Sequence, residues 1–549
     1  MNLLKSALFS ASALYALASL QGPANASPGR IQRVDSAETR PISPVDLKTR
    51  ARPNILLVLA DDMGYSDLGM FGSGIRTPNL DSLARRGLLF TQFYNEAKCT
   101  ESRAALLSGR PSRAVLARAP LDSNVDSPLA PEIPTLAEAL QAQGYDTYIS
   151  GKWHLGERPD QWPDKRGFAH SFSLVTGASS YFEMRMREAQ DDPAQSSFWP
   201  SKPFMIKDGA RWPIPQSGFF MTDAIADTAR EMISEHSRLD SGKPFFLYLA
   251  FTAPHFPLHA PAEDIARYKG KFDSGWSTWR DRRLTAMKTA KLLPPGTKLA
   301  SMPASIPGWE TIQDKGEWAR RMEVFAAQLD RLDKNLGKVI SELKATGQYD
   351  NTLILFLSDN GAASMSPEAM ARDFGYVIPG AQIGSRESNT AYGEPWAAVS
   401  NTPLRSYKQS LYEGGMRTPM IAFWPEGLKR RGTTSVPGQI NDLFPTLVSL
   451  AGGDSVPAAT NGVNLAPLFS GRQVPSAERF WAYRAYRAVR LGQWKAVSPD
   501  NGKTWQLFNL ANDAGENMDL AGSHPDRVRS MASDWMAWSL AAGKPYEKK

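Results

Sequence analysis

Four oxygen-bearing side chains stand at the ends of two apolar runs of the sequence. Asp61 and Asp62 directly follow the run NILLVLA, and Asp359 and Asn360 come just after the run TLILFL. Carboxylate and amide oxygens are the ligands that Ca²⁺ and Mg²⁺ prefer, and the set lacks the His and Cys expected for zinc. Asp62 and Asp359 would also suit helix N-caps. Adjacent carboxylates repel each other unless a cation neutralises them, so the cluster favours a metal site.

Histidine and basic residues occur at the same kind of position. His154 and His255 each follow an apolar run closely. An imidazole titrates near neutral pH, so two of them beside the acids predict proton transfer. Lys152, Arg103 and Lys408 are candidates for binding a tetrahedral anion. Such residues are usually solvated surface charges, and Lys152 is singled out by its place between a strand end and His154.

The sequence contains a single cysteine, Cys99. One cysteine cannot form a disulfide within the chain, so it is an inert buried thiol, an intermolecular partner or a chemically special group. Cys99 precedes the helical run 104–107 and so stands near a helix start. Unsatisfied N–H groups and the positive end of the helix dipole lie there, and they can hold an anion or lower the pKa of a thiol.

These residues need a scaffold that brings strand ends together. The chain alternates between buried apolar runs and stretches of helical periodicity, which predicts an α/β fold with a mostly parallel central sheet flanked by helices. Ligands of such sheets bind outside the carboxyl ends of the strands, where the polar residues stand. The predicted strands are 54–60, 145–150, 244–251, 352–357 and 418–424, and the clearest helices are 78–86, 135–143 and 325–343.

Two stretches, 156–216 and 260–316, are rich in Trp, Pro and charge and lack clean periodicity. We expect them to be long insertions over the site. The C-terminal part reads as a smaller α+β domain with antiparallel strands and a closing helix. Its predicted elements are a short helix at 441–452, strands at 488–497 and 505–510, and a helix at 527–540.

The N-terminus resembles a secretory signal. Residues 1–26 combine Lys5, an apolar run and the small-x-small sequence Ala24-Asn25-Ala26. We expect cleavage before Ser27, a polar lead-in over 27–52, and a periplasmic or secreted protein with no membrane association after cleavage. A retained N-terminal anchor is the alternative.

Composition limits the class of protein. The 549 residues are 42% hydrophobic and 22% charged, which excludes a disordered chain and a polytopic membrane protein. The formal net charge of +7 is small and spread out, so it does not predict a nucleic-acid partner. A local basic cleft for a small anion is the better interpretation.

The motifs together resemble the sulfatase family, most closely its bacterial arylsulfatase branch. Cys99-x-x-Ser102-Arg103, followed by Leu107-Ser108-Gly109-Arg110, is similar to the sulfatase signature. Glu101 departs from it, because sulfatases usually carry Pro or Ala there. The other matching motifs, in order, are Ala60-Asp61-Asp62-Met63-Gly64, Thr77-Pro78-Asn79-Leu80-Asp81, Gly151-Lys152-Trp153-His154-Leu155-Gly156, Ser358-Asp359-Asn360-Gly361, and Lys408 with Glu413-Gly414-Gly415.

The resemblance implies an alkaline-phosphatase-like catalytic domain over 53–430 and a small C-terminal domain over 431–549. It implies that a maturation enzyme converts Cys99 to Cα-formylglycine. One hydroxyl of the hydrated aldehyde would attack the sulfur of a sulfate ester, and the other would lose its proton to expel sulfate. The implied roles are Ca²⁺ (or Mg²⁺) binding by Asp61, Asp62, Asp359 and Asn360; stabilisation of the formylglycine oxygens and sulfate by Arg103 and Lys152; elimination with His154 as base; and sulfate binding and leaving-group protonation by His255 and Lys408.

Two alternatives stay open at this level. A phosphatase, or a phosphodiester or phosphonate monoester hydrolase, could use the same scaffold and metal acids. The chain could also be a catalytically silent binding protein for sulfated glycans. In that case Trp276, Trp279 and Trp309 of the second insertion would stack on sugar rings.

Overall fold

The computed structural model describes residues 39–41, 52–116, 127–182, 204–215, 217–373 and 380–542. The predicted signal segment 1–26 and most of the lead-in lie outside this part of the chain. Within it, no helix is both long enough and apolar enough to cross a membrane.

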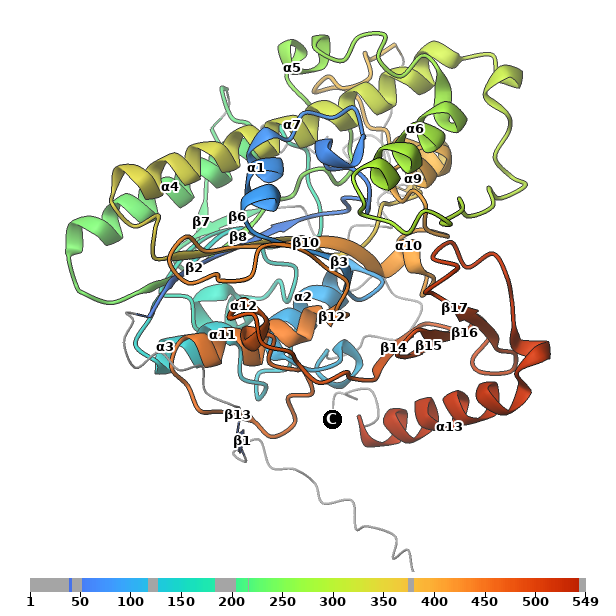
Figure 1. Ribbon diagram of the computed structural model, residues 1–549. Helices are drawn as coiled ribbons and strands as arrows, with labels where there is room; N and C mark the ends of the chain where they lie inside the picture. The colour runs from blue at the N-terminus through green and yellow to red at the C-terminus, as the bar shows by residue number, and fades with distance from the viewer. Residues whose placement is uncertain are drawn as a thin grey trace, which may run out of the picture. The chain divides into compact units, whose positions relative to one another are not determined.

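A large mixed sheet forms the centre of the fold (Figure 1). The strands are β2 (Asn54–Ala60), β3 (Leu88–Tyr94), β4 (Asp146–Lys152), β5 (His170–Leu174), β6 (Met205–Lys207), β7 (Ala210–Trp212), β8 (Phe245–Ala250), β9 (Thr352–Ser358), β10 (Arg417–Phe423), β11 (Gly432–Thr434) and β12 (Gly438–Gln439). Their order is β11-β3-β10-β9-β2-β8-β4-β5-β6-β7, and β12 also pairs with β3. β9, β2, β8, β4 and β5 are parallel, whereas β10 is antiparallel to β3 and β9. The predicted α/β class with a mostly parallel sheet is confirmed.

Helices cover both faces of this sheet. The helices of the described residues are α1 (Pro78–Arg86), α2 (Cys99–Ser108), α3 (Leu136–Ala142), α4 (Met221–Leu239), α5 (Ala262–Ala266), α6 (Gly275–Thr289), α7 (Lys315–Ala345), α8 (Pro367–Asp373), α9 (Gly393–Ser400), α10 (Glu413–Met416), α11 (Leu443–Leu450), α12 (Ala466–Phe469) and α13 (Pro525–Ala541). Short 3-10 turns are η1 (Gly69–Phe71), η2 (Ser112–Ala114), η3 (Pro159–Gln161), η4 (Pro163–Lys165), η5 (Trp309–Thr311), η6 (Ile440–Asp442) and η7 (Ala521–Ser523). In Figure 1, α1, α4 and α7 lie on one face, and α2, α3 and α11 lie on the other.

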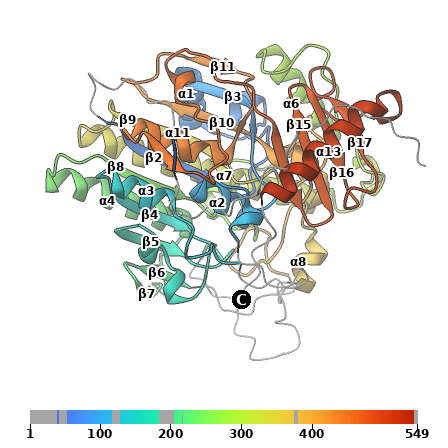
Figure 2. The same cartoon turned by 90° about the horizontal axis from the view of Figure 1, so that it is seen from below.

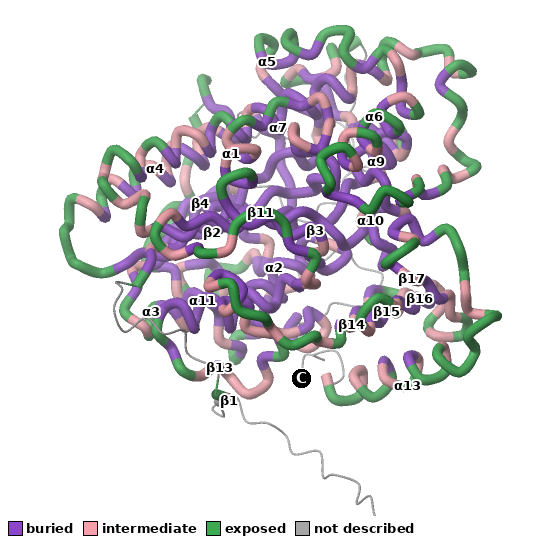
Figure 3. Tube along the Cα trace, in the orientation of Figure 1, coloured by how far each residue is buried: buried purple, intermediate pink, exposed green. Residues whose placement is uncertain are grey.

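The central strand β2 shows why its sequence is apolar throughout. Leu56 and Val58 belong to the core shared with α4 and α7, whereas Leu57 and Leu59 belong to the core shared with α2 and α11. Successive side chains of a strand point to opposite faces, so a strand covered on both sides has no polar face. The sheet is accordingly buried along its central strands (Figure 3).

The structure differs from the prediction in several places of the central fold. β3 and the 19-residue helix α4 were not predicted. The segment 156–216 is not only an insertion, because β5, β6 and β7 extend the central sheet. These three strands are short, and β7 is largely exposed, so they show little of the apolar signal that marks a buried strand.

The C-terminal part contains the predicted antiparallel sheet and closing helix. The predicted strand 488–497 is wrong, because a turn at 492–493 divides it into two strands, and the strand at 479–483 was not predicted. Its strands are β14 (Arg479–Tyr483), β15 (Tyr486–Leu491), β16 (Trp494–Ser498) and β17 (Gln506–Asn509). One face packs on α13, which crosses the strands in Figure 2, and the other packs on residues of the central fold such as Tyr94 and Leu411. A separate strand pair joins β1 (Thr39–Pro41) to β13 (Ser455–Pro457). The boundary at 430/431 stays a prediction, although β11 and β12 lie beyond it and pair with β3.

Candidate active site

Parallel strands bring the predicted site residues to one edge of the sheet. β9, β2, β8 and β4 are neighbours in that order and run in the same direction. Asp61 and Asp62 directly follow β2, Asp359 and Asn360 directly follow β9, and Lys152 is the last residue of β4. Residues that are about 300 positions apart in the chain therefore become neighbours: Asn360 Nδ2 donates to Asp62 Oδ1 at 2.7 Å.

The buried acids of this edge lie against basic side chains. Asp61, Asp62 and Asp359 are at most 2% exposed. Lys152 Nζ is 2.6 Å from Asp61 Oδ2, and Lys408 Nζ is 2.6 Å from Asp62 Oδ1. A buried charge is costly unless it is paired and hydrogen-bonded, so these contacts keep the carboxylates ionisable inside the protein.

Arg103 connects the acids of β9 to the end of β4. Its Nε and one terminal nitrogen donate to Asp359 Oδ2 at 3.2 and 2.9 Å. The other terminal nitrogen donates to the carbonyl of Lys152 at 2.9 Å and lies 3.4 Å from the hydroxyl of Tyr248. The guanidinium is completely buried. Its planar set of donors fixes the distance between α2 and two strand ends.

Cys99 is the first residue of α2 and lies against the acids. Its Sγ is 3.3 Å from Asp61 Oδ1 and 3.9 Å from Asp62 Oδ1, and the residue is 2% exposed. Burial and the neighbouring carboxylates, Asp359 before Asp61, raise the pKa of the thiol well above its usual value. The lowering of the thiol pKa that a helix start can cause is therefore outweighed here, and an unmodified Cys99 is a poor nucleophile at neutral pH.

The two predicted histidines are neutral at neutral pH. Burial lowers the pKa of His255 to about 4, and its Nε2 lies 3.4 Å from Asp62 Oδ2. Burial and the charge of Lys152 hold the pKa of His154 well below its usual range. For Lys408 burial acts against the charge, but the Asp62 carboxylate dominates and raises the pKa well above its usual value. The site thus combines neutral imidazoles with a protonated ammonium group.

The sequence did not point to Thr100 or Tyr248. Thr100 Oγ1 lies 3.2 Å from His154 Nε2, and Tyr248 lies beside Arg103. Tyr248 sits inside the apolar run of β8, where it is indistinguishable from a core residue. Thr100 adjoins Cys99, and that position in the sequence is the one feature that could have marked it as a site residue. His154 also has a positive φ of 56°, a rare backbone conformation for this residue type that is common at functional sites.

The two acids that contact Arg103, Asp61 and Asp359, have pKa values that are shifted in opposite directions. Burial, together with the charge of Asp61, raises the pKa of Asp359 to about 7. For Asp61 burial acts in the same direction, but the charges of Lys152 and the other bases outweigh it and hold the pKa far below its usual range. A divalent cation beside both groups would favour their ionised forms.

The oxygen-bearing residues fit a hard cation. Asp62 Oδ2 and Asn360 Oδ1 are buried and have no hydrogen-bond partner within the described residues. Atoms of Asp61, Asp62, Cys99 and His255 also lie within 4.8 Å of one another, as a metal site requires. Unsatisfied buried oxygens are costly, and a cation ligand would satisfy them. The donor set of three carboxylates and one amide suits Ca²⁺ better than zinc.

A tight backbone contact supports the loop after β9. The N–H of Gly361 donates to Gly415 O at 3.1 Å, and the N–H of Ala362 donates to Asn401 Oδ1 at 3.1 Å. A Cβ at Gly361 would lie 1.8 Å from the carbonyl oxygen of Gly414. Only glycine allows this approach of two loops, one of which carries Asn360.

Replacing Gly361 with alanine should therefore destabilise the protein by about 1–3 kcal/mol or more, because the backbone must move to remove the clash. We also expect weaker binding of a cation at Asn360, since the movement starts next to that residue. Thermal unfolding with and without Ca²⁺ measures both effects. The control is Gly296→Ala, where a Cβ meets nothing within 4 Å. Equal stability of the two variants would contradict the role assigned to this contact.

The tryptophans of the second insertion do not form a sugar-binding surface. Trp276, Trp279 and Trp309 are at most 6% exposed, and Trp276 packs edge-on against Trp309 with ring centroids 4.8 Å apart. The suggestion that they stack on sugar rings was wrong, because core packing uses their faces.

Glu101 lies on α2, and its Oε2 is buried without a hydrogen-bond partner in the described part of the chain.

Comparison with known proteins identifies the class of this site. A family model described as Sulfatase matches residues 53–453. The chain belongs to the sulfatase family. The family resemblance of its motifs is thereby confirmed, and the chain is an enzyme that hydrolyses sulfate esters.

This sulfatase is similar to proteins from a yeast and from a bacterium. It is 32% identical over 539 residues to an uncharacterized sulfatase of Schizosaccharomyces pombe, covering 90% of this chain and 94% of that protein. It is 32% identical over 422 residues to an arylsulfatase of Klebsiella aerogenes, covering 73% and 87%. Its fold matches a crystal structure of Ps i-CgsB in complex with k-i-k-neocarrahexaose, with a TM-score of 0.67 and 27% identity over 90% of this chain and 95% of the other.

Proposed function

We propose that this sulfatase is of the arylsulfatase type and uses a Cα-formylglycine made from Cys99 as its nucleophile. The observation that carries the proposal is the position of Cys99: its side chain lies 3.3 Å from Asp61 at a helix start. Lys152 and Lys408 each contact one of the two acids beside it. Hydrated formylglycine supplies two hydroxyl groups on one carbon, so the enzyme can both accept a sulfuryl group and expel it by elimination.

The protonation states of the surrounding groups match the proposed roles. Neutral His154 can accept the proton that must leave during elimination. Protonated Lys408, with His255 beside the same acid, can bind the sulfate and supply a proton to the departing oxygen. Arg103 and Lys152 place positive charge where the nucleophile and the sulfuryl oxygens carry negative charge. Both of these groups are buried and paired with carboxylates, so little reorganisation is needed during the reaction.

We also propose that Asp61, Asp62, Asp359 and Asn360 hold Ca²⁺, with Mg²⁺ as the alternative. The cation would offset negative charge at the nucleophile and the sulfate. Removal of the ion with a chelator should lower the melting temperature and the turnover of 4-nitrophenyl sulfate. Ca²⁺ in large excess over its Kd should restore both, because an ion that binds only the folded state adds about 4 kcal/mol at 1,000 times its Kd. Restoration by Zn²⁺ but not by Ca²⁺ or Mg²⁺ would contradict the assignment.

The nucleophile is tested by mass spectrometry of the protein from its native host. We expect the peptide around Cys99 to contain an aldehyde in place of the thiol-bearing methylene group. Glu101 lies within the sequence that the maturation enzyme would recognise. The fraction of Cys99 that is converted therefore shows how well the enzyme tolerates Glu101. A peptide that carries only free thiol, in a preparation that is fully active, would overturn the proposal. Parallel assays with 4-nitrophenyl sulfate and 4-nitrophenyl phosphate test the reaction, and we expect a strong preference for the sulfate.

For the location of the enzyme we propose the periplasm or the exterior of the cell. The signal-like segment 1–26 supports this. The maturation enzyme would then be a partner that acts on the chain before it folds, because Cys99 is buried in the folded protein.

A further inference from the structure

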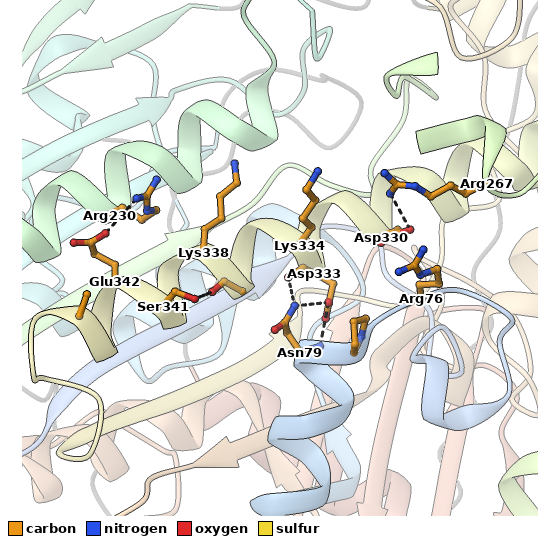
Figure 4. A pocket seen from close by; sticks show the side chains of 13 residues that line it. Arg76, Asn79, Arg230, Arg267, Asp330, Asp333, Lys334, Lys338, Ser341 and Glu342 are labelled. Carbon is orange, nitrogen blue, oxygen red and sulfur yellow. Dashed lines mark hydrogen bonds and ion pairs between the residues drawn. The ribbon is translucent and has the colours of Figure 1, made fainter. Parts of the chain in front are cut away.

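A groove of about 900 Å³ lies on the outer side of the helices that cover one face of the sheet. Its walls come from α1, α4, α7 and the loop after α5 (Figure 4). Five basic residues line it: Arg76, Arg230, Arg267, Lys334 and Lys338. Three acids line it as well. Which ligand the groove can bind therefore depends on which of these charged groups are already paired within the protein.

Each of the three acids has a structural partner. Asp333 accepts hydrogen bonds from the backbone N–H groups of Asn79 and Leu80 at 3.1 and 2.8 Å, which closes the start of α1. Asp330 accepts from the hydroxyl of Tyr268 at 2.9 Å. Glu342 lies 3.3 Å from Arg230. The acids of the groove therefore hold helices together and are not free to bind a cation.

The basic residues of the groove are less completely paired with acids. Arg230 is paired with Glu342, and Arg267 pairs with Asp264 at 2.9 Å. Among the described residues, the one acid within 4 Å of the Lys338 ammonium group is Asp227, at 3.8 Å. Arg76 and Lys334 are exposed, and within the described part of the chain no acid lies within 4 Å of either charged group.

The uncommitted lysines follow the axis of the groove. Lys334 and Lys338 are one helical turn apart on α7, which separates them by about 6 Å along the helix. In Figure 4 both side chains extend into the space beside α4, and Arg76 lies toward the other end of the same row. The groove therefore presents a line of positive charge rather than a single point.

The groove is separate from the active site. None of its lining residues is among the proposed catalytic or metal-binding residues. α7 contacts the active site through Gln328, whose amide lies 3.4 Å from the carbonyl of His255. Gln328 is buried, whereas Lys334 is exposed about 1.7 turns further along the helix.

We propose that this groove binds a sulfated stretch of a polymeric saccharide substrate, remote from the ester that is being hydrolysed. The proposal rests on the proposed function, because it takes the polymer to be a sulfate ester of the class that the active site cleaves. A row of cations about one helical turn apart matches a chain that carries one anionic group on each of successive sugar units. Such a site would raise the local concentration of substrate without touching the reacting atoms.

The lining also argues against other occupants. None of the described lining residues is aromatic. Neutral sugars and single-stranded nucleic acids are usually bound by stacking on aromatic rings, so the groove is suited to reading charge alone. It also lacks the large apolar side chains that insert into a lipid surface.

The test is the double variant Lys334→Gln/Lys338→Gln, made in the full chain. The probe is dextran sulfate, with binding measured by affinity electrophoresis at low and physiological ionic strength. We expect about tenfold weaker binding by the variant at low ionic strength and a smaller dependence on salt, because two charge contacts are lost. Turnover of 4-nitrophenyl sulfate should stay within twofold of the wild type. The control Lys298→Gln/Lys503→Gln removes the same charge from exposed positions outside the groove and should leave both measurements unchanged.

Three outcomes would overturn the proposal. The groove variant could bind dextran sulfate as well as the wild type, or the control variant could lose as much affinity. Single-stranded DNA or anionic vesicles could bind the groove more tightly than dextran sulfate, which would assign it to another class of partner. Failure of the proposed function can be distinguished from failure of this proposal. In that case the wild type would not hydrolyse 4-nitrophenyl sulfate, whereas the effect of the variant on dextran sulfate binding would still be measurable.

Discussion

The variant Cys99→Ala should lose at least about 10⁴-fold in kcat for 4-nitrophenyl sulfate, because it has no group that can become the covalent nucleophile. Its fold should remain, since within the described residues the hydrogen bonds of the thiol are those to Asp61 and Asp62, and alanine fits the same space. The measurements are steady-state kinetics and thermal unfolding of the two proteins produced in the native host. A variant that keeps more than about one hundredth of the wild-type turnover, at equal metal content, would contradict the assignment.

The variant Cys99→Ser separates the two halves of the reaction. A serine hydroxyl can accept a sulfuryl group but has no second hydroxyl from which elimination can proceed. We therefore expect no sustained turnover and a stable sulfated peptide that mass spectrometry detects after incubation with 4-nitrophenyl sulfate. Sustained turnover by the serine variant would show that water releases the sulfate directly and that the aldehyde chemistry is unnecessary.

The main features of the site could be predicted because each candidate residue stands at a strand end. Asp61, Asp359 and Lys152 come from three strands that are parallel in one sheet, so their carboxyl ends must meet at one edge. Cys99 and Arg103 come from α2, and their spacing of four residues places them on one face of the helix. Topology alone therefore brought the acids, the thiol and the bases together.

Other features depend on tertiary contacts that no local pattern carries. β10 was predicted from its apolar run, but its antiparallel direction depends on pairing with β3 and β9. Trp276 and Trp309 pack against each other, and Trp279 packs against Phe272, which a polar and irregular stretch of sequence does not reveal. The same holds for the burial of Lys495, whose strand β16 reads as an ordinary amphipathic strand.

Lys495 lies in a cluster of buried charges between the C-terminal sheet and the central fold. Its Nζ is 2.9 Å from Glu413 Oε1 and 3.0 Å from Glu516 Oε1, and all three side chains are completely buried. The backbone N–H of Glu413 also donates to Glu516 Oε2 at 2.7 Å. Glu413 begins α10, whose glycines pack against the loop that carries Asn360. The cluster therefore connects the C-terminal sheet to the proposed metal site.

The two carboxylates titrate in opposite directions. Burial, and then the charge of Glu413, raise the pKa of Glu516 to about 7 although Lys495 lowers it. For Glu413, burial is outweighed by Lys495 and Arg417, which lower the pKa to about 2. A carboxyl group whose pKa is raised on folding stabilises the protein below the unfolded value near 4.5, and that contribution is lost as the pH rises through 7. Glu413 contributes in the opposite sense, with stability that is lost only as the pH falls toward 2.

Replacing Lys495 with methionine should therefore cost about 3–5 kcal/mol of unfolding free energy at pH 8, because Glu516 must then either stay ionised without its cation or take up a proton that the unfolded chain does not bind. At pH 5 the loss should be smaller, because Glu516 is then protonated and only Glu413 remains charged, still paired with Arg417 at 3.2 Å. Adding Glu516→Gln to the variant should restore part of the stability at pH 8 and remove the pH dependence. Urea unfolding at the two pH values measures these differences, and Lys503→Met, at an exposed position in the connection between β16 and β17, is the control. Equal losses at pH 5 and pH 8 would show that the variant acts through packing alone, because a loss caused by unpaired charge must follow the protonation of Glu516.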